Sequence, residues 1–305
     1  MKSAFELAAA KWRNIVKPVL WGSKESRGQA RKRLTLMIFQ KLGTDITFRR
    51  NGFVWRGHSS CVITQSIFLN DHYQDQHIKP LIPFIDVKRP VIVNIGANIG
   101  DIALPLSRVA ERVIAIEPNP DTFARLKYNV SKNGLCERII CSQTAISDTE
   151  GTAELVVAGQ PGNSEIRSDG ENLGFGGLDQ AIGSVQVKTK RLDDLVRTLD
   201  IVPDQVALVW SDTQGFESYV VASGHRLWAS GVPLWVEIWP KGLDCHGGTA
   251  HFIDLCKQHF THIVRCNQFG GEPEPIDALD AIIAGLKPLE FTDALLIPRK
   301  PGPSA

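Results

Sequence analysis

Short apolar runs alternate with longer segments of mixed polarity from about residue 88 onward. The runs at residues 91–95, 112–116 and 138–141 have the length and composition of buried strands. The segments at 99–110 and 120–133 lie between them and have helical length and spacing. This order of strands and helices predicts parallel strands joined by right-handed crossovers.

Four more strands are predicted at residues 206–210, 234–238, 262–266 and 294–298. A helix follows Gly215, and a long loop joins the last two strands. The seven strands together predict a doubly wound, mostly parallel α/β sheet.

The first 85 residues do not follow this alternation. Residues 1–45 are rich in Lys and Arg and have helical spacing, whereas 48–54 and 61–68 have the character of short strands that could cover a site. We expect an N-terminal helical and short-strand extension at 1–85 and the main domain at 86–300. The helical stretch either packs on the main domain or binds a partner or a membrane surface. A glycine-rich stretch at 159–184 is either a lid or a disordered linker.

Composition excludes several classes of protein. The 305 residues carry a formal net charge of +1, so no strong field attracts nucleic acid. No apolar run approaches the ~20 residues that cross a bilayer, and Lys11, Arg13 and Lys17 interrupt any signal-peptide core. The six cysteines show no paired framework, which favours reduced thiols and a cytoplasmic protein. Cys and His residues gather between Cys245 and Cys266 without a C-x-x-C pair, so no metal is predicted there.

The stretch VIVNIGANIGD at residues 91–101 is the sharpest chemical signal in the chain. It joins an apolar strand to a helix through Gly96 and Gly100, where a ligand can approach the backbone and the free N–H groups of the helix start. Dinucleotide dehydrogenases have G-x-G-x-x-G at this place. Asn98 replaces the second glycine here, which disfavours a diphosphate and moves the prediction from NAD towards S-adenosylmethionine.

Glu117 ends the second strand, about 20 residues after the glycine turn. A carboxylate at this place can accept hydrogen bonds from both ribose hydroxyls of a nucleoside cofactor. Thr144 and Ala145 follow the third strand, where the topology places the adenine.

These motifs resemble the FkbM-like family of class I, S-adenosylmethionine-dependent methyltransferases, which includes O-methyltransferases of natural products. The resemblance covers about residues 90–238 and rests on NIGANIGD, AIEPNP, the L-x-x-N-x-x-x-N-G pattern of Leu126, Asn129 and Asn133, TAISDTEG, RLDDL and SDTQGFE. It implies a Rossmann-like fold with S-adenosyl-L-methionine as cofactor. The cofactor-binding residues that we predict are Asn94, Gly96, Asn98, Gly100, Asp101, Glu117, Pro118, Asn119, Thr144 and Ala145.

The chain departs from the family pattern at two places. Asn94 stands where the family usually has an Asp that helps to hold the methionine ammonium group. The family's K-x-D-x-E-G-x-E becomes W-S-D-T-Q-G-F-E, so that Trp210 and Gln214 replace the Lys and the first Glu.

Two carboxylates are candidates for the chemistry. Asp212 follows the fourth strand and Glu237 ends the fifth, so both should face the crevice beyond the strand ends. We predict Asp212 as the base that takes the proton of an acceptor hydroxyl, with Glu237 as the second candidate. A helix-capping role for Asp212 stays open. Both carboxylates could bind Mg²⁺, but no third ligand is visible, so a metal is not predicted.

Four tryptophans gather around the last strands, either as core packing or as a surface for a sugar: Trp210, Trp228, Trp235 and Trp239.

From the family resemblance and the two carboxylates together, we predict methyl transfer to a hydroxyl of a small molecule or saccharide, without a nucleic-acid partner or a membrane span. The alternatives are a methyltransferase fold that binds without catalysis and an NAD(P)-dependent oxidoreductase. The second lacks both G-x-G-x-x-G and Y-x-x-x-K.

Overall fold

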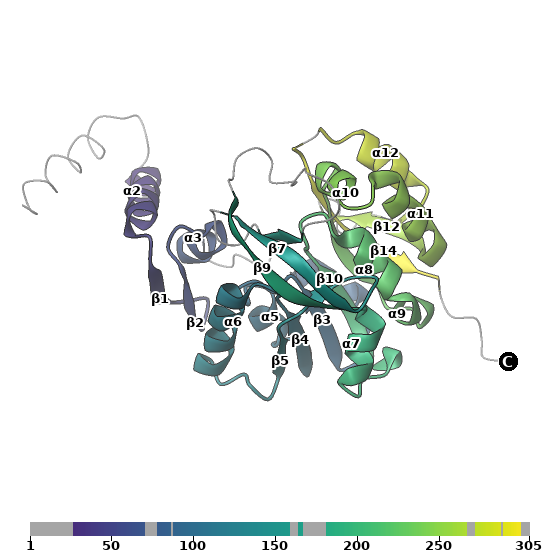
Figure 1. The fold of residues 1–305 in the computed structure, drawn as a ribbon, viewed down its shortest axis with the longest axis horizontal. Coiled ribbons are helices and arrows are strands. Elements are labelled where there is room, and N and C mark those ends of the chain that lie inside the picture. The colour runs from purple at the N-terminus through teal and green to yellow at the C-terminus, as the bar shows by residue number, and fades with distance from the viewer. Residues whose placement is uncertain are drawn as a thin grey trace, which may run out of the picture.

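A sheet of eight strands runs through the molecule, and helices cover it (Figure 1). The structure is a computed structural model that describes residues 27–70, 78–86, 88–158, 164–166, 181–266, 272–287 and 289–299. Strands β5, β4, β3, β10 and β11 are parallel, whereas β14 is antiparallel to both of its neighbours. From edge to edge the strands are β13 (Glu274–Pro275), β12 (Phe260–Arg265), β14 (Thr292–Pro298), β11 (Leu234–Ile238), β10 (Val206–Ser211), β3 (Val91–Ile95), β4 (Arg112–Ile116) and β5 (Ile139–Ser142).

All seven predicted strands are present, and β13 adds a two-residue strand at one edge. The predicted helix at 120–133 is α6 (Pro120–Lys132), but the one at 99–110 is reduced to α5 (Ala103–Leu106) among turns. The prediction of a long loop before the last strand is wrong, because the described part of this connection contains β13 and α12 (Ala278–Ala284).

Successive side chains of each central strand point to opposite faces of the sheet, where they pack in two different hydrophobic cores. Val91, Val93 and Ile95 of β3 pack on one face of the sheet, whereas Ile92 packs on the other. The second face is covered by α5 and α6. The first face is covered by α7 (Leu192–Thr198), which the short η2 (Pro203–Gln205) follows, α8 (Glu217–Ser223), α9 (His225–Ala229), α11 (Thr249–His259) and α12. Strands buried on both faces read as continuous apolar runs, which is why the sequence located them.

The extension before the main sheet consists of a helix, a hairpin, a second helix and a 3₁₀ turn. These are α2 (Arg27–Leu42), β1 (Asp45–Arg50), β2 (Phe53–His58), α3 (Val62–Leu69) and η1 (Lys79–Phe84). The prediction of a strand at 61–68 is wrong. Its β-branched residues suggested a strand, but Thr64 and Ile67 are buried three residues apart, which is the spacing of a helix. Residues 1–26, which hold most of the predicted N-terminal helical stretch, lie outside the described residues.

Two asparagine side chains of α6 attach the hairpin to the main domain. The Asn133 amide accepts from the Val54 N–H (2.8 Å) and donates to the Val54 carbonyl (2.7 Å). The Asn129 amide does the same with the N–H and carbonyl of Arg56, at 2.6 and 3.0 Å. Because both amides satisfy the backbone of β2, they act in place of a neighbouring strand.

A second sheet, not predicted from the sequence, lies beside the carboxyl ends of the main strands. Its order is β6 (Ala145–Ile146), β9 (Ala181–Lys190), β7 (Gly151–Ala158) and β8 (Glu165–Ile166). The stretch at 159–184, predicted as a lid or linker, enters this sheet at 164–166 and 181–184, and the rest of it lies outside the described residues. Within the described ranges, no helix is long and apolar enough to span a bilayer.

Candidate functional site

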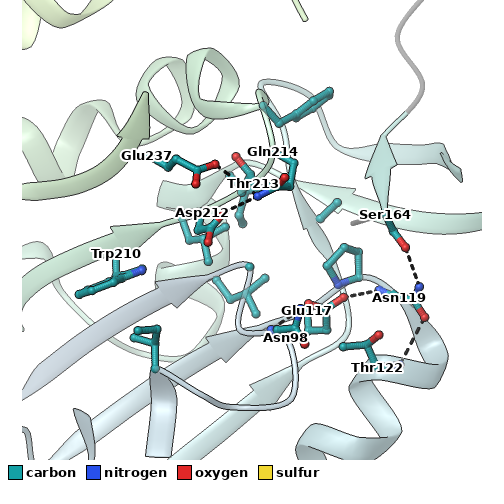
Figure 2. A pocket seen from close by; sticks show the side chains of 18 of the residues that line it. Asn98, Glu117, Asn119, Thr122, Ser164, Trp210, Asp212, Thr213, Gln214 and Glu237 are labelled. Carbon is teal, nitrogen blue, oxygen red and sulfur yellow. Dashed lines mark hydrogen bonds between the residues drawn. The ribbon is translucent and has the colours of Figure 1, made fainter. Parts of the chain in front are cut away.

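A cavity of about 520 Å³ opens at the carboxyl ends of the central strands. It lies where β3 separates β4 from β10, which is the crevice where doubly wound sheets bind ligands. Its volume falls within the roughly 300–1,000 Å³ of small-molecule sites. Figure 2 shows two groups of side chains in it: Asn98, Glu117 and Asn119 on one side, and Asp212, Thr213, Gln214 and Glu237 on the other.

The glycine turn after β3 is packed against the loop after β10. Gly96 has φ +75°, and a Cβ at this position would lie 1.8 Å from the carbonyl oxygen of Asp212. Gly100 has φ +95°, and a Cβ there would lie 2.5 Å from a methyl carbon of Leu104. The positive φ favours glycine at both positions, and at Gly96 the close backbone leaves no space for a Cβ.

Asn98 adopts a left-handed conformation, with φ +46°. Its side-chain oxygen accepts a hydrogen bond from the backbone N–H of Ile99 at 2.8 Å. Asn tolerates this conformation better than most residues because its short side chain bonds to nearby backbone. A turn with Asn in place of the second dehydrogenase glycine is therefore stable in this chain.

Glu117 fixes the turn to the end of β4. One carboxylate oxygen accepts from the N–H of Asn98 (3.0 Å), and the other accepts from the N–H of Asn119 (2.8 Å). Burial raises the pKa of Glu117 to about 7, and the two N–H groups oppose this rise. A buried carboxyl with free lone pairs suits a ligand that donates hydrogen bonds.

The wall next to Glu117 is built by α6 and the second sheet. Asn119 caps α6 by accepting from the N–H groups of Asp121 and Thr122, and its amide donates to the Ser164 hydroxyl at 3.1 Å. The Thr144 hydroxyl donates to the carbonyl of Lys188 on β9 at 3.0 Å. The place predicted for adenine is thus bordered by the second sheet.

Three carboxyl groups, which we call the carboxylate cluster, line the opposite side of the cavity: Asp212, Glu237 and Asp293. Glu237 of β11 and Asp293 of β14 are cross-strand partners. Burial raises the pKa of all three, of Asp293 to about 7 and of Glu237 well above its usual range. Repulsion from Asp212 adds to the rise at Glu237 and Asp293.

Gln214 lies between two members of the cluster. Its amide nitrogen donates to Asp212 at 2.8 Å and to Glu237 at 3.3 Å (Figure 2). The hydrogen bond from Gln214 lowers the pKa of Asp212 and so opposes the effect of burial.

Glu217 has a structural position at the start of α8. One of its oxygens accepts from both the N–H and the hydroxyl of Thr213, at 2.8 and 2.7 Å. Glu217 is 1% exposed and does not line the cavity. These contacts stabilise the loop that carries Asp212.

Ten of the twelve predicted site residues line the cavity. Gly100 and Asn94 do not. Gly100 acts through close packing, whereas Asn94 is fully buried beside Trp210 in the sheet. Neither polar atom of its amide has a hydrogen-bond partner among the described residues. The ten that line the cavity are Gly96, Asn98, Asp101, Glu117, Pro118, Asn119, Thr144, Ala145, Asp212 and Glu237.

Several lining residues were not predicted. One of them is Asp293, which comes into the site through its register opposite Glu237. Val62 and Ile63 reach the cavity from α3, and Ser164 reaches it from the position before β8. No local motif marks any of these positions, because tertiary pairing alone brings them there.

The tryptophans divide between the site and the core. Trp210 and Trp235 are stacked at 3.7 Å and line the cavity. Trp228 instead packs on Phe260, and its N–H donates to the carbonyl of Val221. Trp239 is half-buried and does not line the cavity. Trp210 and Trp235 thus remain candidates for contact with an acceptor.

No metal centre is found within the described ranges of the chain, where no group of three or more His, Cys, Asp or Glu side chains could hold an ion. The six cysteines are free thiols. Cys256 is buried, in the stretch where Cys and His residues gather.

The strand order, the glycine turn and the acidic end of β4 define a Rossmann-like, class I methyltransferase fold. Residues 94–238, just under half of the chain, match the family model of the methyltransferase FkbM domain. The match begins at Asn94 and ends at Ile238, so it contains the glycine turn, Glu117 and both catalytic candidates.

The chain is also similar to individual proteins. It is 27% identical over 157 residues to the 2-O-methyltransferase NoeI of Sinorhizobium fredii, a match that covers 48% of this chain and 63% of that relative. Among solved structures, it is similar to the methyltransferase FkbM of Methylobacillus flagellatus (11% identity, TM-score 0.42, covering 95% of this chain and 60% of that one). TYW2 of P. horikoshii in complex with MeSAdo has 12% identity and a TM-score of 0.40, with 90% of this chain and 84% of that one covered.

Proposed function

We propose that the chain is an S-adenosylmethionine-dependent methyltransferase that transfers a methyl group to a hydroxyl of a small molecule or saccharide. The observation that carries the proposal is the shared cavity. The turn at Gly96 and the carboxyl of Glu117 suit a nucleoside, and they open into the same space as Asp212 and Glu237. A methyl donor and a proton acceptor can thus meet there, as the reaction requires.

The charge of the cavity suits a cationic cofactor. Among the described lining residues five are acidic and none is basic. When bound, S-adenosylmethionine supplies an electrophilic methyl group on a positively charged sulfur, which a negative surround favours. The diphosphate of NAD would meet the same field as an anion, which supports the methyltransferase over the oxidoreductase. The five acidic residues are Asp101, Glu117, Asp212, Glu237 and Asp293.

Glu117 would hold the ribose of the cofactor. Each of its oxygens already accepts one backbone N–H, and each has a second lone pair for a ribose hydroxyl. Thr144, Ala145 and Asn119 would border the adenine. Gly96 and Asn98 would keep the turn close to the ligand, with Asp101 and Pro118 at its sides.

Asp212 would take the proton from the acceptor hydroxyl, with Glu237 as the second candidate. S-adenosylmethionine would supply the methyl group to the hydroxyl oxygen, and the carboxylate would accept the proton that the hydroxyl loses. The raised pKa of both groups makes each a stronger base once it is ionised. The relative NoeI is a 2-O-methyltransferase, which supports oxygen as the methylated atom.

The remaining parts of the proposal concern partners and location. The free thiols support a reducing, cytoplasmic environment. The net charge of +1 and the acidic cavity favour a small-molecule or saccharide acceptor over nucleic acid. Asp212 and Glu237 serve as bases in this proposal, and no Mg²⁺ is required.

Calorimetric titration with S-adenosylmethionine and S-adenosylhomocysteine tests the cofactor, with NADH as the control ligand. We expect micromolar binding of the first two, loss of that binding in Glu117→Ala, and no binding of NADH. If neither S-adenosylmethionine nor S-adenosylhomocysteine binds, the proposal is wrong.

A second experiment separates an enzyme from a protein that only binds. Purified protein is incubated with methyl-labelled S-adenosylmethionine and a panel of saccharides and phenols, and labelled products are counted. Asp212→Asn should lose transfer while it keeps its affinity for S-adenosylhomocysteine. Tight cofactor binding without transfer to any member of a broad panel would favour the non-catalytic alternative.

A further inference from the structure

We propose that Gln214 is a positioning residue whose side-chain amide ties Asp212 and Glu237 into one unit, in which one carboxylate accepts the proton of the acceptor hydroxyl. This inference deepens the proposed function and rests on it for its catalytic meaning. Its structural part, that one amide donates hydrogen bonds to two carboxyl groups, rests on geometry alone.

The amide of Gln214 contacts both carboxylates through the same nitrogen, at 2.8 Å from Asp212 and 3.3 Å from Glu237. An amide nitrogen has two N–H groups and only donates, so it can serve both carboxylates at once and can take no proton from either. A hydrogen bond donated to a carboxylate favours its ionised form. Gln214 therefore favours the form of each carboxylate that can accept a proton.

The backbone holds Gln214 in a conformation that glutamine rarely adopts. Its φ is +56°, in the left-handed region. The next residue, Gly215, has φ +102°, and a Cβ there would lie 2.4 Å from the backbone of Gly242 in α10 (Pro240–Cys245). On the other side, the carbonyl of Asp212 lies against Gly96. Close packing at both ends fixes the loop, and the strained conformation aims the amide at the two carboxylates.

Other acidic groups surround Asp212 and Glu237, so a neutral hydrogen-bond donor is useful there. The acidic groups nearest to this pair come from different elements: Asp293 from β14, Glu217 from α8 and Glu117 from the end of β4. Among the described lining residues none is basic. Repulsion from Glu217 and Asp293, in addition to that from Asp212, disfavours ionisation of Glu237. The amide of Gln214 opposes that effect without adding a charge that would repel a cationic cofactor.

The test is a titration of the side-chain carboxyl groups by ¹³C NMR, on the full chain with S-adenosylhomocysteine as the bound probe. Asp212→Asn and Glu237→Gln assign the two signals. Gln214→Met keeps the length of the side chain and removes both donors. We expect the titration midpoints of Asp212 and Glu237 to rise by about one pH unit, since a hydrogen bond to a charged group has an effect of that order. Gln214→Glu, which adds an acid, should raise them further.

Gln186→Met on the exposed surface of β9 is the matched control and should leave both midpoints unchanged. Far-UV circular dichroism shows that each variant is folded, whether or not it binds S-adenosylhomocysteine. If Gln214→Met does not fold, Gln214→Asn replaces it, because Asn tolerates positive φ but is too short to span both carboxylates. Unchanged midpoints in a folded Gln214 variant overturn the inference.

The titration needs no turnover, so the two proposals fail separately. Shifted midpoints in a protein that methylates no acceptor support the control by Gln214 and contradict the proposed function. Where an acceptor is found, kcat of Gln214→Met should fall about tenfold at pH 7 and recover towards the wild-type value at higher pH, as a one-unit shift predicts. An equal loss of kcat at every pH would contradict the positioning role.

Discussion

The carbonyl oxygen of Asp212 occupies the space that a Cβ at Gly96 would need, only 1.8 Å from its ideal position. The glycine turn after β3 and the loop after β10 are thus in direct backbone contact. The cofactor-binding and catalytic candidates meet through this contact, because the two loops cannot move independently at this point.

Gly96→Ala should therefore damage both loops. The added methyl group collides with backbone, and the positive φ adds strain, so we expect a loss of about 2–4 kcal/mol in the free energy of unfolding and a large loss of affinity for S-adenosylhomocysteine. Denaturant unfolding and calorimetry measure the two effects. Gly183→Ala is the control, because a Cβ there meets nothing within 4 Å. Similar stability of the two variants would contradict the close contact.

The affinity for S-adenosylhomocysteine should depend on pH through Glu117. Its pKa is raised to about 7, so the carboxyl loses its proton mainly between pH 6 and pH 8. If the ionised form accepts the ribose hydroxyls, binding is about tenfold weaker at pH 6 than at pH 8. Calorimetry at the two pH values measures this ratio. Glu117→Gln has no proton to lose and should show weak binding with little pH dependence.

Glu217→Gln should change the pH dependence of stability. The folded-state pKa of Glu217 is raised to about 7 from 4.5, chiefly by burial. The folded state therefore holds this proton more tightly than the unfolded chain, and the resulting stabilisation is lost as pH rises from 4.5 to 7.

The variant has no such loss, so it should be more stable than the wild type by about 2–3 kcal/mol at pH 8, with the difference disappearing near pH 4. Urea unfolding at both pH values tests this. Glu111→Gln on the surface is the control and should show no comparable change. A constant difference at all pH values would indicate a packing effect instead of titration.

Asn133→Ala should loosen the hairpin without unfolding the main domain. It removes the partner of both backbone groups of Val54 and leaves them unsatisfied, at a cost of about 1–3 kcal/mol. Hydrogen exchange of the Val54 and Arg56 amides should accelerate at least tenfold. Ser131→Ala, at an exposed position of the same helix, should leave the exchange unchanged. Equal exchange in both variants would show that the hairpin is held mainly by its apolar contacts.

The central strands could be predicted from the sequence because they are buried on both faces. Short, mainly apolar runs such as residues 91–95 and 234–238 are typical of strands that are buried on both faces. The glycine turn and Glu117 could be predicted as well, since both lie next to a strand end in the sequence. Their contact through the N–H of Asn98 uses atoms only nineteen positions apart in the chain.

The parts that were missed depend on pairing between distant segments. The second sheet pairs β7 with β9 across residues 159–180, a distance in sequence that no local pattern bridges. Asp293 enters the site because β14 runs antiparallel to β11, which places it opposite Glu237. The run at 61–68 is short enough for a helix or a strand, and only its packing in the fold decides between them.

The contact between α6 and β2 has a further consequence. Four residues along a helix rise about 6 Å, close to the span of two residues along a strand, so Asn129 and Asn133 match Arg56 and Val54 in register. The two amides touch only backbone atoms, and those atoms are the same for almost every amino acid. The sequence of the β1–β2 hairpin can therefore diverge while its attachment to α6 stays intact.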